Sequence, residues 1–485
     1  MNIKRTITQW EPGYLQLLVL FALLQLFISL FTTDFTLTFE ESLWQYIGRS
    51  WFRNGLVPYS GGVDNQSPLI FAIFGLSDRL FGVNYWFPRA LGTICQTAGL
   101  YYVYKIANHL AGKQVGLLAL SLYGLSLLWH VTGNESVSYT ETYEVTFLIV
   151  SVYCFVKAQN KKDFLITGCM AGIGLVFRIT AVFTITAFFL FALYKYKVNA
   201  VFFGAGILLA VACFLLLEAL AGINIHDQYI YAFADNFNHG SPYEHTLQWK
   251  FGQFTQKFIY SPMILFYPLI IGYGIIKKRV DLFVLWLIFS FIGVGFIGEF
   301  TWAHLREVLP SLSLMGSITI MHLLTFYKLS FNLALLIIGI TFFPNLIYPL
   351  QNLKHFLLNK KSNVAETCTQ PYIKPDPGIL KKLGWWVKDN TSITDKVFVA
   401  GFGVQTQVYS ERQSVYFNEI QTPLAKKLLF NDLDHNKPAM ILIPLFPQYE
   451  QFIQPDERLF ISNIVSKYYA LDRCMYNYNI YKIKK

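Results

Sequence analysis

Charged residues are scarce in this chain. Asp, Glu, Lys and Arg make up 14% of its 485 residues, whereas an ordinary soluble domain carries about 25%. Hydrophobic residues reach 54%, aromatic ones included. Apolar runs near the roughly 20 residues that cross a bilayer recur through the first three quarters of the chain. The composition therefore excludes a soluble protein and indicates a polytopic helical membrane protein.

Several sequence motifs are absent. The chain has no P-loop, no GxGxxG that opens a helix in a βαβ unit, no HExxH and no GxSxG. Its six cysteines form no CxxC and no Cys/His metal spacing. Nothing indicates a nucleotide at the cytoplasmic face, so an activated donor must come from the lipid side. Cys368 and Cys474 lie outside the apolar runs and can pair in an oxidising compartment.

The net charge of +10 is explained by membrane topology and does not indicate nucleic acid, because cytoplasmic loops of membrane proteins are rich in Lys and Arg. With the N-terminus inside, eleven spans place every basic cluster on the cytoplasmic side. The predicted spans are 13–32, 87–106, 114–131, 142–157, 164–178, 179–196, 198–220, 260–276, 280–298, 304–325 and 330–349.

This topology requires the apolar run 68–81, which carries Asp78 and Arg79, not to cross. Residues 33–87 then form a long outer loop, and 221–259 form a second one. In the first loop, Trp44, Ile47, Trp51, Phe52 and Gly55 repeat at helical spacing, with Gln45, Arg49 and Arg53 on the other face. That pattern predicts an interfacial amphipathic helix with its tryptophans at headgroup depth.

The tail changes to ordinary globular sequence. Four segments are typical of strands (396–401, 414–419, 439–445 and 478–483) and three of helices (377–388, 423–433 and 455–466). Alternating strands and helices predict a small α/β domain. We therefore expect a membrane domain at 1–350 and an extracytoplasmic α/β domain at 351–485.

Ionisable residues gather at the predicted outer ends of the spans. Glu40 and Glu41 follow the first span, Glu141 opens the fourth, Arg178 closes the fifth, and His304 and Arg306 open the tenth. Such groups are costly at membrane depth and tend to face cavities or partners. Arginines can hold the phosphate of a lipid-linked anion, and a carboxylate can take the proton of an incoming hydroxyl. Either Glu40 or Glu41 can be that base.

Together these residues resemble a known family. The segment E-E-S-L-W-Q-Y-I-G-R…N-G-L-V-P-Y…D-N-Q-S-P-L is similar to the first outer loop of GT-C membrane glycosyltransferases, namely family 39 and dolichyl-phosphate-mannose mannosyltransferase-like enzymes such as the aminoarabinose transferase. Further matches are R-A-L-G-T-I, T-E-T, G-L-V-F-R-I-T-A, H-L-R-E-V-L-P and, in the tail, D-K-V-F-V-A-G-F. The resemblance covers nearly the whole chain.

The resemblance implies an inverting transferase that uses a polyprenyl-phosphate-linked sugar outside the cytoplasm, in a bacterial inner membrane. It makes Glu40, with Glu41 beside it, the catalytic base, and Arg178, His304 and Arg306 the phosphate-binding groups. Other candidates are Glu141, Asp64, Asp227 and Asp235. Two departures are Glu40 in place of aspartate and Gln66-Ser67-Pro68 in place of Lys-Pro-Pro. A divalent cation that bridges phosphate and carboxylate is neither required nor excluded.

Two other classes of function remain open. A transporter or flippase of lipid-linked sugars predicts charges at the bilayer midplane, internal repeats and broken helices. An O-antigen polymerase or ligase shares the many spans and a long outer loop, but predicts neither the early Glu-Glu pair nor a terminal α/β domain. The acceptor, whether a glycan, a lipid or a protein, is not indicated by the sequence.

Overall fold

The computed structural model is mainly helical and divides into two compact units, each of which is described by itself. Unit 1 comprises residues 1–32, 89–216 and 244–354, and unit 2 comprises 33–88, 217–243 and 355–485. The structure describes residues 13–31, 36–129, 138–228, 246–259, 261–278, 281–297, 302–347, 350, 368, 377–401, 403–415, 417–418, 423–445 and 455–484.

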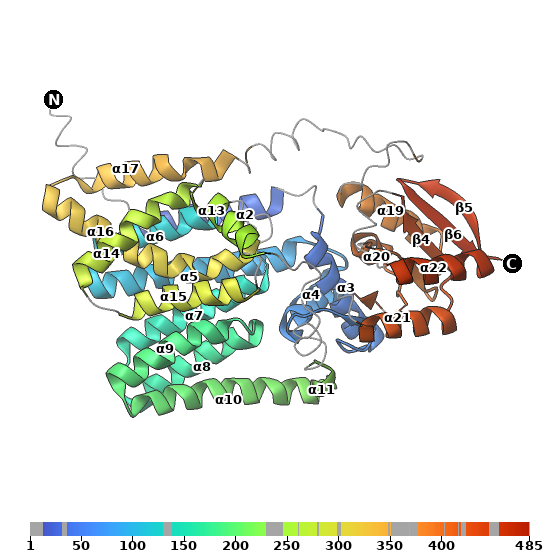
Figure 1. Ribbon diagram of the computed structural model, residues 1–485, viewed down its shortest axis with the longest axis horizontal. Coiled ribbons are helices and arrows are strands. Elements are labelled where there is room, and N and C mark those ends of the chain that lie inside the picture. The colour runs from blue at the N-terminus through green and yellow to red at the C-terminus, as the bar shows by residue number, and fades with distance from the viewer. Residues whose placement is uncertain are drawn as a thin grey trace. The chain divides into compact units, whose positions relative to one another are not determined.

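Unit 1 is a bundle of long helices (Figure 1). Its helices are α2 (Tyr14–Phe31), most of α5 (Trp86–Ala111), α6 (Lys113–Leu127), α7 (Thr140–Lys157), α8 (Lys161–Phe177), α9 (Ala181–Tyr196), most of α10 (Asn199–Leu220), α13 (Leu247–Ile259), α14 (Phe266–Lys277), α15 (Leu282–Ile297), α16 (Leu309–Tyr327) and α17 (Phe331–Phe342). Short 3-10 turns lie at η3 (Pro262–Leu265), η4 (Trp302–Glu307) and η5 (Phe343–Leu346).

A helix is present at each of the eleven predicted spans, but not every helix is long. By length and composition, α10 and α16 qualify as membrane-crossing helices. Shorter apolar helices occupy Tyr14–Leu30, Ala181–Tyr196, Pro262–Lys277, Leu282–Gly295 and Phe331–Asn345. The predicted helical architecture is confirmed, and the number of spans stays a prediction.

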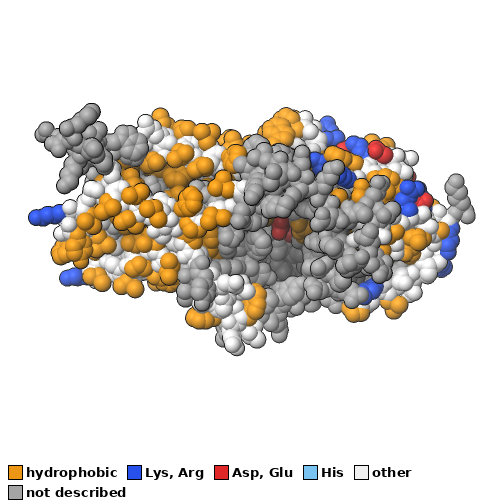
Figure 2. Space-filling view, turned by 90° about the horizontal axis from the view of Figure 1, so that it is seen from above, with side chains coloured by type: hydrophobic (Ala, Val, Ile, Leu, Met, Phe, Trp, Pro, Cys, Tyr) orange, Lys and Arg blue, Asp and Glu red, His pale blue; other side chains and the backbone are white. Residues whose placement is uncertain are grey.

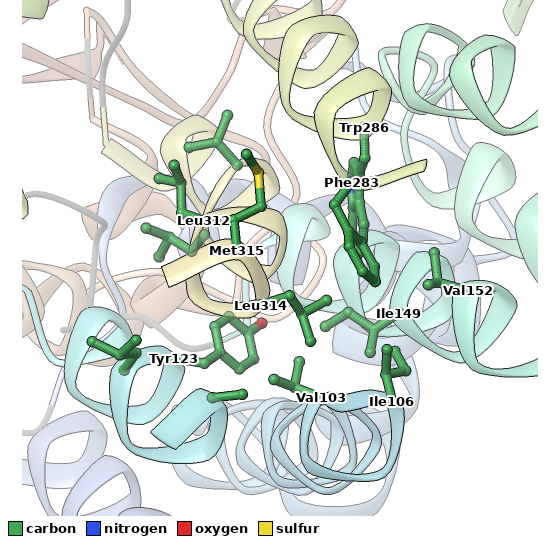
Figure 3. Packing of buried hydrophobic residues seen from close by; sticks show 14 of the residues in the cluster. Val103, Ile106, Tyr123, Ile149, Val152, Phe283, Trp286, Leu312, Leu314 and Met315 are labelled. Atoms are coloured by element: carbon green, nitrogen blue, oxygen red, sulfur yellow. The ribbon is translucent and has the colours of Figure 1, made fainter. Parts of the chain in front are cut away.

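The core of unit 1 is made of aliphatic and aromatic side chains from α5, α6, α7, α15 and α16 (Figure 3). Around Tyr123 the figure shows Val103, Ile106, Ile149, Val152, Phe283, Trp286, Leu312, Leu314 and Met315. All of these side chains are almost fully buried. This packing fixes the ends of the helices, where the ionisable side chains lie.

The basic residues of unit 1 lie at alternate turns. Lys or Arg residues occupy or flank the turns after α5, α7, α9, α14 and α16. Because successive helices run in opposite directions, these turns meet at one end of the bundle. Figure 2 shows a few blue side chains at the left edge of the view, next to a largely orange surface, and further blue side chains on the right. The start of α7, the turn after α8 and η4 fall at the opposite end. Arg178, Glu141 and His304 thus lie away from the basic loops, and the side of the membrane that each end faces stays a prediction.

Unit 2 combines helices with short strands. Its elements are α3 (Phe39–Asn54), β1 (Gly62–Val63), α4 (Pro68–Phe81), α11 (Ile225–Gln228), α19 (Pro377–Asp389), β2 (Val397–Val399), α20 (Val404–Ser410), β3 (Phe417–Asn418), α21 (Pro423–His435), β4 (Met440–Pro444), α22 (Pro455–Tyr468), β5 (Tyr469–Met475) and β6 (Tyr478–Ile483). The division of the whole chain into domains 1–350 and 351–485 stays a prediction.

The tail contains a four-stranded sheet in the order β2-β4-β6-β5. Strands β2 and β4 are parallel, and the other two pairs are antiparallel. The strand expected at 414–419 is shorter and belongs elsewhere, since β3 pairs in parallel with β1 of the first loop. The sequence analysis also missed α20 and β5.

Helices α3 and α4 pack with their backbones in contact. A Cβ atom added to Gly48 would lie 2.3 Å from the carbonyl oxygen of Phe71, and one added to Gly75 would lie 2.6 Å from that of Gly48. Only glycine permits this approach. The run 68–81 therefore forms a helix packed along α3 within unit 2.

The orientation predicted for α3 is wrong at Gln45 and Arg49. Both side chains are buried rather than on an exposed polar face. Asp78 of α4 is fully buried, and Arg49 Nη2 lies 2.6 Å from its Oδ2. Arg53 Nε donates to Asp78 Oδ1 at 2.7 Å, and Gln45 Nε2 donates to Oδ2 at 3.0 Å. The helical periodicity placed Gln45, Arg49 and Arg53 on one face of α3. It did not reveal that Asp78 on the facing helix gives these polar side chains a buried partner.

The first loop is bonded to the tail within unit 2. Arg49 Nη1 donates to the carbonyl of Val408 at 3.0 Å, and the backbone N–H of Leu37 donates to Tyr409 Oη at 2.9 Å. The N–H of Ser414 donates to Tyr46 Oη at 3.0 Å. Cys368 and Cys474 form a disulfide, with their Cα atoms 5.7 Å apart. A disulfide fits an oxidising compartment, where the tail is expected.

Replacing Asp78 should destabilise unit 2. In Asp78→Asn, the buried Arg49 guanidinium loses its counter-charge, which costs about 3–5 kcal/mol. Hydrogen exchange of the α3 and α20 amides would detect the loss. Arg79→Gln is the matched control, because Arg79 is exposed on the same helix. Equal protection in Asp78→Asn and the wild type would show that the ion network does not hold these helices.

Glu457 should make the tail less stable as the pH rises. Burial raises the pKa of its carboxyl to about 7, against the lowering effect of Lys426. The folded state then binds the proton more tightly than the unfolded chain, whose glutamate has a pKa of about 4.3. Stability is therefore lost between about pH 4.3 and 7, by up to about 4 kcal/mol.

Hydrogen exchange of the α22 amides would measure this dependence. In Glu457→Gln the decrease in protection with rising pH should disappear. The control is Glu411→Gln: burial raises the Glu411 pKa, but the Lys388 contact outweighs it, and the net pKa is lowered. The stabilising contribution of ionised Glu411 is lost as the pH falls. Glu411→Gln should therefore remove a loss of protection at low pH, whereas Glu457→Gln should remove one at high pH. A decrease that persists unchanged in Glu457→Gln would contradict the assignment.

Candidate active site

Glu141 lies in the first turn of α7, where the dipole of the helix favours a negative charge. The helix begins after Tyr139, which provides no side-chain cap. The Glu141 side chain is almost completely buried, with 4% of its surface exposed. A carboxylate in that position needs strong hydrogen-bond donors.

Arg178 supplies one of these donors. The residue ends α8 in an extended conformation, with φ −155° and ψ 127°. Its Nη1 donates to Glu141 Oε1 at 2.5 Å. The Arg178 side chain is also buried, so this ion pair is shielded from water. Shielding makes the pair strong, and breaking it would leave an uncompensated charge.

His304 completes a three-residue cluster. Its Nδ1 lies 2.8 Å from Glu141 Oε1 and 2.5 Å from Arg178 Nη2. The tautomer or charge of the imidazole decides which of these contacts is a hydrogen bond. The His304 side chain is 23% exposed, against 8% for Arg178 and 5% for Glu141. His304 is therefore the member of this trio that a ligand can reach most readily.

Arg306 adds a second guanidinium from the same 3-10 turn. Its side chain is fully buried, and Nη1 donates to Thr142 Oγ1 at 2.5 Å. The guanidinium carbon lies 5.8 Å from the centre of the Tyr139 ring. Since Thr142 follows Glu141 on α7, two arginines converge on the same helix terminus. Such an arrangement can bind a phosphate group.

Glu40 and Glu41 belong to unit 2 and differ in their environment. Glu41 is fully buried in a capping box: its N–H donates to Thr38 Oγ1, and its Oε2 accepts from the Thr38 N–H at 2.9 Å. Glu40 is only partly buried in the same first turn. The structure thus gives Glu41 a role in the start of α3 and leaves Glu40 the more accessible carboxylate.

The remaining acidic candidates have different surroundings. Asp64 is buried, and its Oδ2 accepts from Trp44 Nε1 at 2.8 Å. Asp227 is half-exposed on the short helix α11, with an ion pair to its neighbour His226. Asp235 lies outside the described residues. Within the described part of the chain, no group of three or more His, Cys, Asp and Glu side chains could hold a metal ion.

Glu144 was missed by the sequence analysis. It lies one turn after Glu141 on α7 and is fully buried. Glu307, which follows Arg306, accepts a hydrogen bond from Thr184 Oγ1 at 2.6 Å. The i, i+3 spacing in T-E-T-Y-E could have indicated that Glu141 and Glu144 share a helix face. The site thus contains a second group of carboxyls.

The family comparison matches part of the chain. Residues 65–218 match the family model described as Dolichyl-phosphate-mannose-protein mannosyltransferase. None of the curated proteins matches the sequence.

Solved structures match over nearly the whole chain. ArnT from Cupriavidus metallidurans bound to undecaprenyl phosphate has a TM-score of 0.66 at 10% identity, covering 97% of this chain and 98% of that one. The oligosaccharyltransferase AglB from Archaeoglobus fulgidus, in complex with an inhibitory peptide and a dolichol-phosphate, has a TM-score of 0.57 at 12% identity, covering 89% and 69%.

Two further structures extend the comparison. The Archaeoglobus fulgidus oligosaccharyltransferase in complex with Zn and sulfate has a TM-score of 0.54 at 10% identity, covering 88% of this chain and 68% of that one. The mycobacterial arabinofuranosyltransferase AftD has a TM-score of 0.52 at 11% identity, and the match covers 96% of this chain but 41% of that one. These matches confirm the resemblance predicted from the motifs: the chain has the GT-C glycosyltransferase fold, and its residues 65–218 are similar to the mannosyltransferase family.

Proposed function

We propose that the protein is an integral membrane glycosyltransferase that moves a sugar from a polyprenyl-phosphate-linked donor to an acceptor hydroxyl on the extracytoplasmic face. The observation that carries the proposal is the convergence of Arg178, His304 and Arg306 on the start of α7. The likeness in fold to ArnT, whose structure was solved with undecaprenyl phosphate bound, supports a lipid-linked anionic donor.

The guanidiniums bind the donor phosphate in this mechanism. The buried Arg178 and Arg306 are already held by Glu141 and Thr142, so little side-chain entropy is lost when the phosphate arrives. As the sugar leaves, negative charge grows on the departing phosphate oxygen. Ordered positive groups in a site with little water stabilise this charge.

Glu40 acts as the general base. Its partial exposure suits contact with an incoming hydroxyl, whereas the Glu41 carboxylate is engaged by the cap of α3. The acceptor oxygen attacks the anomeric carbon, and its proton passes to Glu40. The bond between the anomeric carbon and the phosphate oxygen breaks in the same displacement, so the configuration inverts. Polyprenyl phosphate leaves with the electron pair.

Glu141 is bound by Arg178 and His304, and no step above passes through a cation. Glycans, lipids and proteins all carry suitable hydroxyls, and the acceptor is one of these classes. We place the protein in a bacterial inner membrane, where the oxidised Cys368–Cys474 pair lies outside the cytoplasm.

The rival functions have less support. A flippase needs ionisable groups near the midplane of the bilayer, whereas the trio lies at the ends of α7 and α8. A polymerase or ligase does not account for the early Glu-Glu pair. The fold match to ArnT extends through both units and covers 97% of the chain.

Arg178→Gln should weaken the binding of undecaprenyl phosphate by at least about tenfold, because one charge-assisted contact is worth about 1.5–3 kcal/mol. Binding to the purified protein in detergent would be measured by tryptophan fluorescence. Arg412→Gln is a control, since Arg412 is a buried arginine whose hydrogen bonds lie within the tail. Undiminished affinity in Arg178→Gln would exclude Arg178 as a phosphate ligand.

Glu40→Gln should reduce sugar transfer by about 10²–10⁴-fold, the usual contribution of a general base. Binding of undecaprenyl phosphate should be unchanged. Glu41→Gln should keep most of the transfer activity but lose about 1 kcal/mol of stability through the weakened cap. Mass spectrometry of the copurified lipid would first identify the polyprenyl phosphate. Transfer would then be assayed with a panel of radiolabelled sugars linked to that lipid. Full activity in Glu40→Gln would refute its role as base.

A further inference from the structure

The Glu144 carboxyl is buried without hydrogen-bond donors among the described residues. The residue is fully buried, and within the described part of the chain neither of its oxygens accepts a hydrogen bond. The backbones of α7 and α8 lie close together at this level, because a Cβ added to Gly174 of α8 would lie 3.3 Å from the Glu144 backbone carbonyl oxygen. An ionised carboxylate cannot be stable in such a place without donors.

The charged groups around Glu144 come from three elements. They are Glu141 of α7, Arg178 at the end of α8 and Glu307 of η4. Arg178 is already engaged by Glu141 and His304. A second negative charge beside Glu307 would therefore be opposed by repulsion as well as by burial.

Glu307 differs from Glu144 because it has a donor. Thr184 has a single hydroxyl proton and donates it to Glu307 Oε1 at 2.6 Å. Thr184 Oγ1 also lies 2.8 Å from Ser290 Oγ, so Ser290 must be the donor in that contact. The resulting chain runs from Ser290 through Thr184 to Glu307. It stabilises Glu307 as the ionised member of the pair.

We propose that Glu144 keeps its proton while Glu307 is ionised, so that the two residues carry one negative charge between them. A neutral carboxylic acid avoids the cost of a buried charge and does not need donors for both oxygens. No proton is gained or lost in this arrangement; it stays on the Glu144 carboxyl.

The proton has a consequence for phosphate binding, and this step rests on the proposed function. Arg178 and Arg306 bring two positive charges, whereas Glu141, Glu144 and Glu307 would bring three negative ones if all were ionised. A net negative cluster would repel the donor phosphate. With Glu144 neutral, the two signs balance, and protonated His304 makes the cluster positive. Glu144 is thus a positioning residue that sets the charge of the phosphate site without touching the phosphate.

Infrared spectroscopy of the full-length protein tests the proton directly. At about pH 7, the wild type should show the C=O stretching band of a buried carboxylic acid, which deprotonated glutamates lack. Because other buried glutamates such as Glu457 contribute to this region, the band of Glu144 is read from difference spectra between the wild type and each variant. Glu144→Gln should remove this band, and Glu307→Gln should keep it. Glu144→Asp, which should shift the band without removing it, serves if the amide variant folds poorly. Loss of the band in Glu307→Gln alone, or in neither amide variant, would overturn the proposal.

Binding of undecaprenyl phosphate tests the consequence. At about pH 7, Glu144→Gln and the wild type should bind the probe equally, because the substitution replaces one neutral group by another. At a pH where the infrared band has disappeared, the wild type should bind about tenfold more weakly than the variant, as expected for one added charge nearby. The ratio between the two proteins cancels the titration of the probe and of His304.

The outcomes separate the two proposals. If Glu144→Gln binds the probe about tenfold more tightly already at about pH 7, Glu144 is ionised there and the inference fails. Equal affinities after the band has disappeared would also overturn the charge-setting role. If no variant binds the probe at any pH, the proposed function fails, whereas the infrared band still decides whether Glu144 holds a proton.

Discussion

A buried carboxylate that must be met by donors organises the functional end of unit 1. Glu141 Oε1 is contacted by both Arg178 Nη1 and His304 Nδ1. These residues come from α7, the end of α8 and η4, which are far apart in the sequence. Removing any donor would leave charge in a place with little water, at a cost of several kcal/mol. The contact therefore holds the three segments in one geometry. It also keeps the Arg178 guanidinium ordered at a place where a phosphate could replace part of its contact with Glu141.

The same constraint operates in unit 2 with a different outcome. Asp78 brings together Gln45, Arg49 and Arg53 of α3, and Arg49 reaches on to the Val408 carbonyl. Here the polar side chains satisfy one another's hydrogen bonds, and the network connects the first loop to the tail. The capping box at Thr38 and Glu41 then fixes where α3 begins. Glu40 is held on this helix, which favours a precise position for the catalytic base that we propose.

The sequence predicted what depends on local pattern. Long apolar runs located the helices of unit 1 to within a few residues, as in α9 at 181–196 against the expected 179–196. The basic loops correctly grouped Glu141, Arg178 and His304 at one end. A pattern of period 3.6 does not reveal what covers a helix face, so the burial of Gln45 and Arg49 against Asp78 was not predicted. The pairing of β3 with β1 joins segments more than 350 residues apart, and such contacts leave no local signal.

Gln66-Ser67-Pro68 stands where the family pattern has Lys-Pro-Pro, so the first loop lacks one lysine that could contact a phosphate. Ser67 caps α4 and Pro68 occupies its first turn, so these residues start a helix and bring no positive charge. Arg49 and Arg53 are committed to Asp78.

Among the arginines of the first loop, only Arg79 remains exposed without an ion pair in the described part of the chain. In the proposed function, the phosphate charge is then met chiefly by Arg178, Arg306 and His304. A site that depends on so few positive groups tolerates little additional negative charge, which is why the protonation of a neighbouring carboxyl matters for binding.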